Sequence, residues 1–316
     1  MARRAVTRML DAGDMSVRHV FAVINPVAGR GRGHRAWSAI RPVLRAAGVN
    51  LEETLAPQAG RAEDAAARAA AQGYDLVVAV GGDGTIHETL NGILRGRPDQ
   101  PPTLAVIPGG TANVFARGLG IPRDPAAAAG LLFHGVRRRI DVGQVNDRYF
   151  AAVAGVGFDG EIAVRARRWP PWMDGITRHV GAGLRALLSY RPAEARITID
   201  GRTETLPLFF LTAANTGWYG GGIRIAPHAL ADDGQLAVVY AADLTRLEAV
   251  AVFLSTLSGT HLRRPKIGHA SAREVRVESD APLLVQADGE PVGRVPVTFR
   301  CLPGALAVLV PRPAPE

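Results

Sequence analysis

The sequence predicts two domains: an N-terminal three-layer α/β domain and a C-terminal antiparallel β-sandwich-like domain. In the first part of the chain, short apolar strands alternate with helical patterns, which is typical of a parallel sheet covered by helices. From Arg139 onward, strands follow one another with few helices between them, which indicates an antiparallel sheet or sandwich. We therefore expect domains at 18–140 and 141–303, with 304–316 completing the first domain and 1–17 forming a flexible tail.

The expected elements follow from the spacing of apolar residues. The first domain should contain strands at 19–25, 49–54, 76–80 and 104–107, and helices at about 36–47, 62–72, 86–94 and 114–118. The second should begin with a hairpin that turns at Asn146 and Asp147. Further strands are expected at 196–199, 205–213, 236–240, 274–278, 282–286 and 297–301. A last strand at 306–311 could join either domain.

Composition limits the class of protein. The chain has 316 residues, 47% of them hydrophobic, and a formal net charge of +8, which attracts polyanions of any kind. It has neither a run of about 18 apolar residues nor a convincing signal peptide, so we expect no transmembrane helix and no secretion. Cys301, the only cysteine, can form no internal disulfide, which favours a reducing interior; we expect it in a buried strand.

Lysine is nearly absent, since Lys266 is the only one in the chain. A Walker A loop needs a Gly-Lys-Ser/Thr sequence, and a protein kinase needs a strand lysine on the phosphates. The sequence therefore excludes both kinds of phosphate site. Any ATP must be held by glycine loops, arginine and metal.

The most informative stretch is the turn Gly81-Gly82-Asp83-Gly84-Thr85. An apolar strand stops there and a helical pattern follows, so the turn lies at a helix N-terminus, where free N–H groups favour anions. Asp83 would repel phosphate unless a hard cation lies between them, and Mg²⁺ prefers oxygen ligands shared by carboxylate and phosphate. The turn therefore predicts a metal-bound nucleotide, although an ordinary strand-to-helix turn would also suit these residues.

Two further strands of the first domain end in glycine turns, NPVAGRGRG at 25–33 and PGGTAN at 108–113. Ligands of open α/β sheets bind in the crevice outside the carboxyl ends of the strands. Three turns of one type at one edge favour a nucleotide crevice over three unrelated turns.

The segment at 161–190 combines basic and aromatic residues, which suits an anionic membrane interface. Three arginines adjoin two tryptophans: Arg165, Arg167, Arg168, Trp169 and Trp172. Two prolines between these tryptophans interrupt any continuous amphipathic helix. A solvated loop that packs its tryptophans on the domain is therefore an equal alternative.

Four segments of the chain form a joint pattern: NPVAGRGRG at 25–33, GGDGTIHETLNGIL at 81–94, IPGGTANVFARGLGIP at 107–122 and DGE at 288–290. In order and spacing they resemble the diacylglycerol kinase catalytic-domain family, which includes bacterial lipid kinases and is related to the sphingosine and ceramide kinases. Three more segments fit the same pattern: GFDGEI at 157–162, NTGWYGGGIRIAP at 215–227 and ADDGQL at 231–236. The resemblance extends from about Val20 to Val310.

The resemblance implies that ATP binds between the two domains. The residues that match the family's nucleotide positions are Asn25, Gly29, Arg30, Gly82, Gly84, Thr85, Gly110, Thr111 and Asn113. Asp83 would hold the catalytic Mg²⁺, partly through water, and Asp159 of the GFD segment would contact the lipid headgroup.

Glu290 follows a predicted hairpin turn at Asp288 and Gly289, and this pattern by itself favours a plain hairpin. Phosphoryl transfer to an alcohol needs a group that orients the hydroxyl and takes its proton. Because DGE matches the family pattern, the resemblance implies that Glu290 is the general base.

The resemblance also implies a structural Mg²⁺ site at Asp233 and Gln235 in ADDGQL. Leu230 stands where some relatives have a second acid, which departs from the family pattern. The same residues would suit a hairpin turn, so both interpretations stay open.

We therefore expect a cytoplasmic, ATP- and Mg²⁺-dependent lipid kinase that associates peripherally with the inner face of the membrane and converts diacylglycerol to phosphatidate. Other lipid alcohols stay open as acceptors, and so does a homodimer as the assembly. One alternative is an NAD kinase-like enzyme, because that group also has a GGDG loop, but its downstream Asn-Glu pair is missing here. Another is a non-catalytic lipid or nucleotide sensor with the same fold. Nucleic-acid binding, which would rest on net charge alone, is not expected.

Overall fold

The computed structural model describes residues 19–170, 173 and 175–313. The expected tail at 1–17 and Trp172 lie outside these described residues. The chain divides into two compact units, Met1–Ile140 with Gly304–Glu316, and Asp141–Pro303. It passes from one unit to the other within β5 (Val136–Val145) and again within β15 (Val297–Val310).

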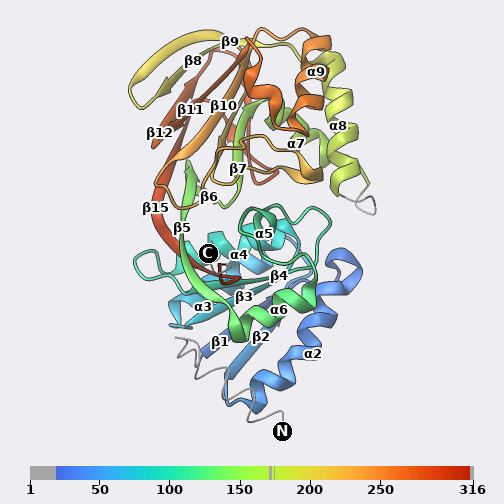
Figure 1. Ribbon diagram of the computed structural model, residues 1–316, viewed down its shortest axis with the longest axis vertical. Helices are drawn as coiled ribbons and strands as arrows, with labels where there is room; N and C mark the ends of the chain where they lie inside the picture. The colour runs from blue at the N-terminus through green and yellow to red at the C-terminus, as the bar shows by residue number, and fades with distance from the viewer. Residues whose placement is uncertain (1–18, 171–172, 174, 314–316) are drawn as a thin grey trace. The chain divides into compact units, whose positions relative to one another are not determined.

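The first unit is an α/β domain with a parallel sheet (Figure 1). The strands pair in the order β2-β1-β3-β4-β15. Besides parts of β5 and β15, the elements are β1 (His19–Ile24), a 3₁₀ turn (Ala28–Gly31), α2 (Arg32–Ala46), β2 (Asn50–Leu55), α3 (Arg61–Ala71), β3 (Leu76–Gly81), α4 (Asp83–Gly96), β4 (Thr103–Pro108), α5 (Val114–Gly118) and α6 (Pro125–His134).

The alternating direction of side chains along the strands explains why helices cover both faces of this sheet. Val20 and Ile24 of β1 belong to a buried cluster with Trp37 of α2 and Leu132 of α6. Because successive side chains of a strand point to opposite faces, Val23 faces the other side, where α3 contacts β1. The three-layer α/β arrangement predicted for this part of the chain is confirmed.

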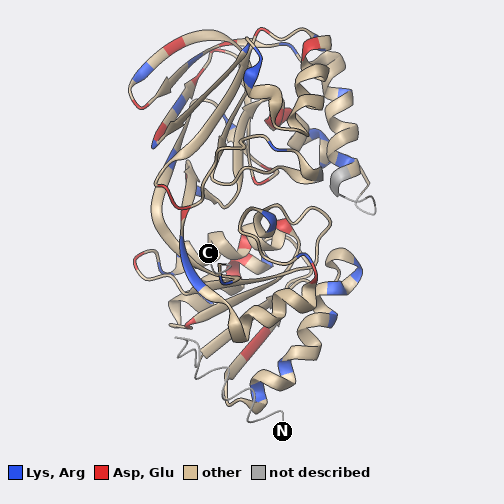
Figure 2. Cartoon of the chain, viewed as in Figure 1, with Lys and Arg blue, Asp and Glu red and all other residues tan. Residues whose placement is uncertain are grey.

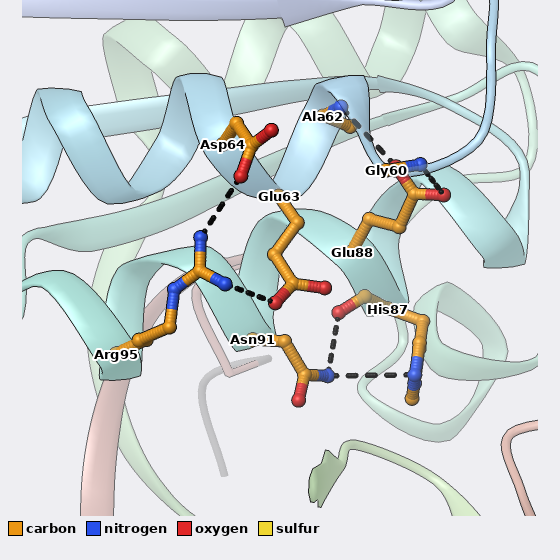
Figure 3. A network of polar contacts seen from close by, with 8 residues as sticks. All are labelled: Gly60, Ala62, Glu63, Asp64, His87, Glu88, Asn91 and Arg95. Atoms are coloured by element: carbon orange, nitrogen blue, oxygen red, sulfur yellow. Dashed lines mark hydrogen bonds and ion pairs between the residues drawn. The ribbon is translucent and has the colours of Figure 1, made fainter. Parts of the chain in front are cut away.

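Helices α3 and α4 pack closely at Gly92 and at the carboxylate of Glu88, the second of which Figure 3 shows. Gly92 of α4 lies so near α3 that a Cβ atom there would be 2.2 Å from the carbonyl oxygen of Glu63. Glu88 of α4 accepts hydrogen bonds from the N–H groups of Gly60 and Ala62 at 2.9 and 3.1 Å, and so caps the start of α3. Figure 3 also shows ion pairs between the two helices, from Arg95 to Glu63 and Asp64. These contacts fix α4, whose first turn contains Asp83.

The second unit is an antiparallel β domain (Figure 1). Its strands pair in the order β14-β13-β7-β9-β8-β12-β15; β10 also pairs with β9 and β11 with β10. The elements that lie wholly within it are β6 (Arg148–Phe150), β7 (Val153–Gly157), α7 (Phe158–Ala166), α8 (Gly175–Ser189), β8 (Ala193–Ile199), β9 (Arg202–Ala214), a 3₁₀ turn (Gly220–Gly222), β10 (Leu236–Ala242), α9 (Arg246–Thr256), a 3₁₀ turn (Thr260–Arg263), β11 (Ile267–Ala272), β12 (Glu274–Glu278), β13 (Leu284–Ala287) and β14 (Glu290–Arg294).

The core of the second unit contains the free thiol of Cys301 in β15, so the expectation of a buried strand residue is confirmed. The expected antiparallel fold class is confirmed as well. Within the described part of the chain, no helix has both the length and the apolar character that spanning a bilayer requires.

Several expected elements differ from the observed ones in the first unit. Helix α2 begins at Arg32, four residues before the expected start, directly after Gly31 with its positive φ of 75°. Helix α6 was not expected, although the sequence carries its start signal. Pro125 stands at its first position, and the Asp124 carboxylate accepts a hydrogen bond from the N–H of Ala127.

In the second unit, the stretch after β7 forms two helices and not the solvated loop that was kept as an alternative. Helix α7 ends at Ala166 and α8 begins at Gly175, so no continuous helix crosses this stretch, as expected. The two strands expected at 297–301 and 306–311 are one continuous strand, β15, and the observed strand β11 was not expected. Strand β11 is weakly apolar and pairs with β10, from which helix α9 separates it in the chain, so no hairpin turn signals it.

The contact between α3 and α4 predicts a large effect of one added methyl group. Gly92→Ala should lower the free energy of unfolding by about 1–3 kcal/mol, because the new Cβ atom must displace the Glu63 carbonyl. Gly183→Ala in α8 is the matched control, since its Cβ atom would lie 3.5 Å from Ile162. The control should gain about 0.5–1 kcal/mol from helix propensity. Urea unfolding followed by circular dichroism measures both; equal stability of the two variants would contradict the close packing.

Candidate active site

The carboxyl ends of β1, β3 and β4 carry the three glycine turns of the first unit, and backbone hydrogen bonds hold these ends together. The N–H of Asn25 donates to the carbonyl of Val80 at 2.9 Å, and the N–H of Gly109 donates to the carbonyl of Gly81 at 2.7 Å. Neighbouring parallel strands end at one edge of a sheet, so the three turns meet there.

The turns approach one another so closely that side chains are excluded at their contact points. Gly29 has a positive φ of 56°, and a Cβ atom there would lie 1.4 Å from the carbonyl oxygen of Gly109. A Cβ atom on Gly110 would lie 2.7 Å from the Cα atom of Gly82. Arg32, which the sequence analysis did not select, links the turns further by donating to the carbonyls of Gly29 and Gly110 at 3.3 and 3.2 Å. The contact leaves bare backbone facing the edge of the sheet.

Asp83 is already the first residue of helix α4, so the observed loop after β3 is shorter than the predicted turn. One carboxylate oxygen accepts a 2.6 Å hydrogen bond from the N–H of Val114, the first residue of α5. The carboxylate therefore joins the beginnings of two helices, and the N-terminal end of α4 favours its negative charge. An oxygen ligand in this place is of the type that Mg²⁺ prefers.

Asn113 offers a buried acceptor at the same edge. Its backbone has a positive φ of 48°, its exposed fraction is 3%, and its Nδ2 donates to the Gly110 carbonyl at 3.0 Å. Its Oδ1 accepts no hydrogen bond from the described residues. A buried acceptor without a donor costs about 1–3 kcal/mol, so this oxygen suits a donor group of a bound molecule.

The other predicted nucleotide residues lie in the same three turns. Nδ2 of Asn25 donates to Oγ1 of the buried Thr85 at 3.4 Å. Arg30 and Thr111 are exposed. A Cβ atom on Gly84 would meet nothing within 4 Å. The first unit thus brings together all nine predicted nucleotide positions and Asp83, whereas Glu290 and Asp159 belong to the second unit.

The DGE segment forms the predicted hairpin turn between β13 and β14. Asp288 and Gly289 both have positive φ, 50° and 87°, which suits a tight two-residue turn. The Asp288 carboxylate accepts hydrogen bonds from three successive N–H groups at 151–153, at 2.8, 2.9 and 3.0 Å. These bonds anchor the turn, and the sequence analysis missed this role because the donors lie far away in the chain. Glu290 follows, and its carboxylate pairs with the guanidinium of Arg167 at the end of α7.

Asp159 lies in the first turn of α7 within a polar cluster that the sequence analysis did not foresee. One of its oxygens accepts hydrogen bonds from the hydroxyls of Thr212 and Tyr219, at 2.8 and 2.5 Å. Burial raises the pKa of Asp159 to about 6, although these two hydrogen bonds oppose the rise. Burial and the Asp159 charge raise the pKa of Tyr219 well above its ordinary value, so the phenol stays a donor. Nε2 of Gln286 lies 3.5 Å from the same phenol oxygen.

The ADDGQL segment forms a bend before β10, and no strand directly precedes it, so the hairpin interpretation is wrong. Oδ1 of Asp233 accepts a hydrogen bond from the N–H of Gln235 at 3.0 Å, and the buried Asp141 accepts one from the N–H of Gly234 at 2.6 Å. No group of three or more His, Cys, Asp or Glu side chains arranged for a metal occurs in the ranges that the structure describes. The Mg²⁺ site at Asp233 and Gln235 stays a prediction.

The arginines of the 161–190 segment are not equally exposed. Arg165 pairs with Glu161 and also donates to the Arg185 carbonyl and to Oγ of Ser189, at 3.2 and 2.9 Å. Its bonds to α8 hold α7 and α8 together, and its side chain is 24% exposed, so it is less available to a membrane surface than expected. The membrane role of this segment stays a prediction. Trp169 packs on α8, where a Cβ atom on Gly181 would lie 2.5 Å from its ring.

Comparisons with known proteins agree with this architecture. Residues 19–145 match the diacylglycerol kinase catalytic domain, and residues 152–310 match the YegS C-terminal NAD kinase beta sandwich-like domain. The chain is 34% identical over 297 residues to a diacylglycerol kinase of Bacillus subtilis, covering 93% of this chain and 97% of that protein. The chain belongs to the diacylglycerol kinase family. The resemblance of the four sequence segments to this family is thereby confirmed.

Other members of the diacylglycerol kinase family give the same result. A diacylglycerol kinase of Mycobacterium tuberculosis is 34% identical over 300 residues, which cover 93% of this chain and 95% of that protein. The crystal structure of a diacylglycerol kinase from Bacillus anthracis superposes with a TM-score of 0.76 at 28% identity, covering 94% of this chain and 98% of that one. Membership of this lipid kinase family makes the chain a kinase, which implies that it uses a nucleotide.

The raised pKa of Asp159 predicts a specific dependence of stability on pH. In the unfolded chain this carboxyl has its ordinary pKa of 3.8, and in the folded chain about 6, so the folded state binds the proton more tightly. Its stabilising contribution is full below about pH 4 and is lost as the pH rises through 6. Asp159→Asn keeps an acceptor oxygen but carries no charge. Its unfolding free energy, measured by urea titration between pH 4 and 7, should therefore lack this decline.

The exposed Asp99 supplies the control for that measurement. Asp99→Asn should keep the wild-type decline of stability between pH 4 and 7. If Asp159→Asn shows the wild-type decline as well, Asp159 is not the group responsible.

Proposed function

We propose that this kinase transfers the γ-phosphoryl group of ATP to the free hydroxyl of diacylglycerol, giving phosphatidate. The observation that carries the proposal is the meeting of three glycine turns around Asp83 at the carboxyl edge of the parallel sheet. Diacylglycerol kinase is also the name of the relatives that match nearly the whole chain. We keep other lipid alcohols as competing acceptors, to be decided by assay.

The residues at this edge fit ATP with Mg²⁺. The contact of Gly29 with Gly109 leaves bare backbone for phosphate, and the buried Oδ1 of Asn113 suits a ribose hydroxyl or the adenine amino group. The residues that would hold ATP are Asn25, Gly29, Arg30, Gly82, Gly84, Thr85, Gly110, Thr111 and Asn113. Asp83 would hold Mg²⁺, partly through water. Bound there, ATP supplies the phosphoryl group and Mg²⁺ offsets its negative charge.

Glu290 would act on the acceptor. Its carboxylate would accept the proton of the lipid hydroxyl, which makes the oxygen a better nucleophile. The three hydrogen bonds to Asp288 hold the turn on which Glu290 lies, so the carboxylate starts from a defined position. In the structure the guanidinium of Arg167 pairs with this carboxylate.

Asp159 would contact the lipid headgroup together with Tyr219 and Thr212. A headgroup hydroxyl can donate to the Asp159 carboxylate, which the hydroxyls of Tyr219 and Thr212 hold in place. A lipid substrate also requires the enzyme to work at a membrane surface, so we propose peripheral membrane association.

A second candidate is phosphorylation of NAD. The observation that favours it is the match of residues 152–310 to a domain described as NAD kinase-like. The two candidates share the nucleotide donor and differ in the acceptor. They are therefore separated by the product and not by the effect of substitutions in the first unit.

Radiolabelled ATP with Mg²⁺ and a panel of acceptors tests the reaction. We expect label in diacylglycerol presented in detergent micelles, and none in NAD. Label in NAD alone would establish the second candidate. Binding of nucleotide and lipid with no labelled product would indicate a non-catalytic sensor.

Two isosteric substitutions test the assigned carboxylates. Asp83→Asn and Glu290→Gln should each lower the kcat for lipid phosphorylation by a factor on the order of 10²–10⁴, because each removes a charge needed at the reacting groups. The matched controls are Asp99→Asn and Glu274→Gln, both on the surface and outside the two clusters, and they should keep wild-type turnover. Near wild-type turnover of Glu290→Gln would refute its role as the base.

A further inference from the structure

Helix α9 exposes an apolar face to solvent. Five large hydrophobic side chains are exposed along it and at its C-cap: Leu247, Val250, Phe253, Leu254 and Leu257. Leu247 is 84% exposed and Leu254 58%. Their spacing of three and four residues places them on one broad side of the helix, while Ala249, Val252 and Thr256 are buried on the other.

Helix α8 has a second apolar face. Val180, Leu184 and Leu188, spaced four residues apart, are all exposed, and Leu184 and Leu188 reach 64% and 69%. Ala182 and Ala186 are fully buried on the opposite side. Within the described residues, eight of the twelve exposed large hydrophobic side chains belong to these two helices and the α9 C-cap. Contiguous exposed apolar surface of this kind marks an interaction site.

The charges that border these faces are positive. Helix α8 contains two arginines and no acidic residue, and α9 begins with Arg246. The one acid in α9, Glu248, is held by Lys266 and by the N–H of Thr245. Figure 2 shows most of both helices without charge. Three exposed arginines lie in the segments joined to the C-terminal end of α9: Arg224, Arg263 and Arg264.

Both helices connect to the polar cluster around Asp159. Helix α8 is bonded through Arg165 to α7, the helix that contains Asp159. At the end of α9, the carbonyl of Thr256 accepts a hydrogen bond from the N–H of Arg224. The guanidinium of Arg224 stacks on the ring of Trp218, which precedes Tyr219, the partner of Asp159. Whatever covers these faces therefore lies on the elements that support the proposed headgroup cluster.

We propose that the exposed faces of α8 and α9 are a docking surface for an anionic lipid bilayer. Apolar side chains bordered by arginine suit the interfacial region of such a membrane, where the side chains leave water and the arginines meet lipid phosphates. A second copy of the chain fits less well. An isologous contact would bring arginines of the same border together, and the acids beside α9, Asp243 and Glu248, are already paired with Lys266. The proposal builds on the proposed lipid kinase activity, since docking places substrate lipid next to the Asp159 cluster.

Vesicle sedimentation without ATP tests the docking surface independently of catalysis. Two double variants of the full chain are compared with wild type: Leu247→Glu with Leu254→Glu in α9, and Leu184→Glu with Leu188→Glu in α8. Each should weaken binding to vesicles of phosphatidylcholine with phosphatidylglycerol by about tenfold or more, because each keeps two apolar side chains out of the bilayer. Leu55→Glu is the control, since Leu55 is 59% exposed and belongs to the other unit; it should bind as wild type does.

Substitution of the arginines should affect binding to anionic vesicles only. Arg246→Gln and Arg263→Gln should each weaken binding to the anionic vesicles by about fivefold, and leave binding to phosphatidylcholine alone unchanged. Equal losses on both kinds of vesicle would contradict the electrostatic part of the proposal.

A fluorescent label keeps the proposal testable if a glutamate variant fails to fold. Leu254→Cys can be labelled selectively with an environment-sensitive dye, because the native Cys301 is buried. The dye should shift to shorter wavelength with anionic vesicles, whereas the same dye at Leu55→Cys should not. No shift at position 254, or wild-type binding by both double variants, would overturn the proposal.

Two outcomes separate this proposal from its alternatives. If light scattering finds a wild-type dimer that the leucine substitutions dissociate, and vesicles do not bind, the faces form an interface between copies and the docking proposal fails. If vesicles bind through these faces but no lipid is phosphorylated, the docking surface stands and the proposed function fails.

Discussion

The first unit depends on a direct contact between backbones at the carboxyl edge of its sheet. The sheet order places β1, β3 and β4 next to one another, and the turns that follow them touch at Gly29, Gly82 and Gly110. Only residues without a Cβ atom allow two backbones to approach so closely. It concentrates N–H groups, a helix N-terminus and the Asp83 carboxylate in one place, which is the arrangement that a metal-bound polyphosphate needs.

The second unit positions its polar side chains differently: carboxylates accept hydrogen bonds from distant parts of the chain. Asp288 accepts three backbone N–H groups and so fixes the turn before Glu290. Asp159 collects two hydroxyls and has its pKa raised by burial. Under the proposed function the two units would contribute complementary chemistry, with donors for a nucleotide in the first and carboxylates for an alcohol in the second. This division agrees with a kinase that takes a nucleotide and an alcohol.

Helices α7 and α8 pack against each other on one side, and α8 exposes apolar side chains on the other. The inner side of the pair is held by Arg165 and by close contact between Trp169 and Gly181. The outer side of α8 carries exposed leucines, a state that ordinarily signals a partner. The basic and aromatic composition of this segment indicated a surface role, but the residues that carry it are aliphatic. Arg165 and Trp169 join the two helices, whereas Arg167 pairs with Glu290.

The sequence by itself determined the two-part fold class, the family, the three glycine turns and the turn before Glu290. The fold class and the turns rest on local patterns, in which strands, glycines and helical segments are neighbours in the chain, and the family rests on the order and spacing of four segments. Only the tertiary structure decided that Thr212 and Tyr219 would meet Asp159, that Asp288 would hold residues 151–153, and that the leucines of α8 and α9 would stay exposed. Partners that come from separate strands and loops leave no periodic signal, because their meeting depends on sheet order and helix packing, which the whole chain sets together.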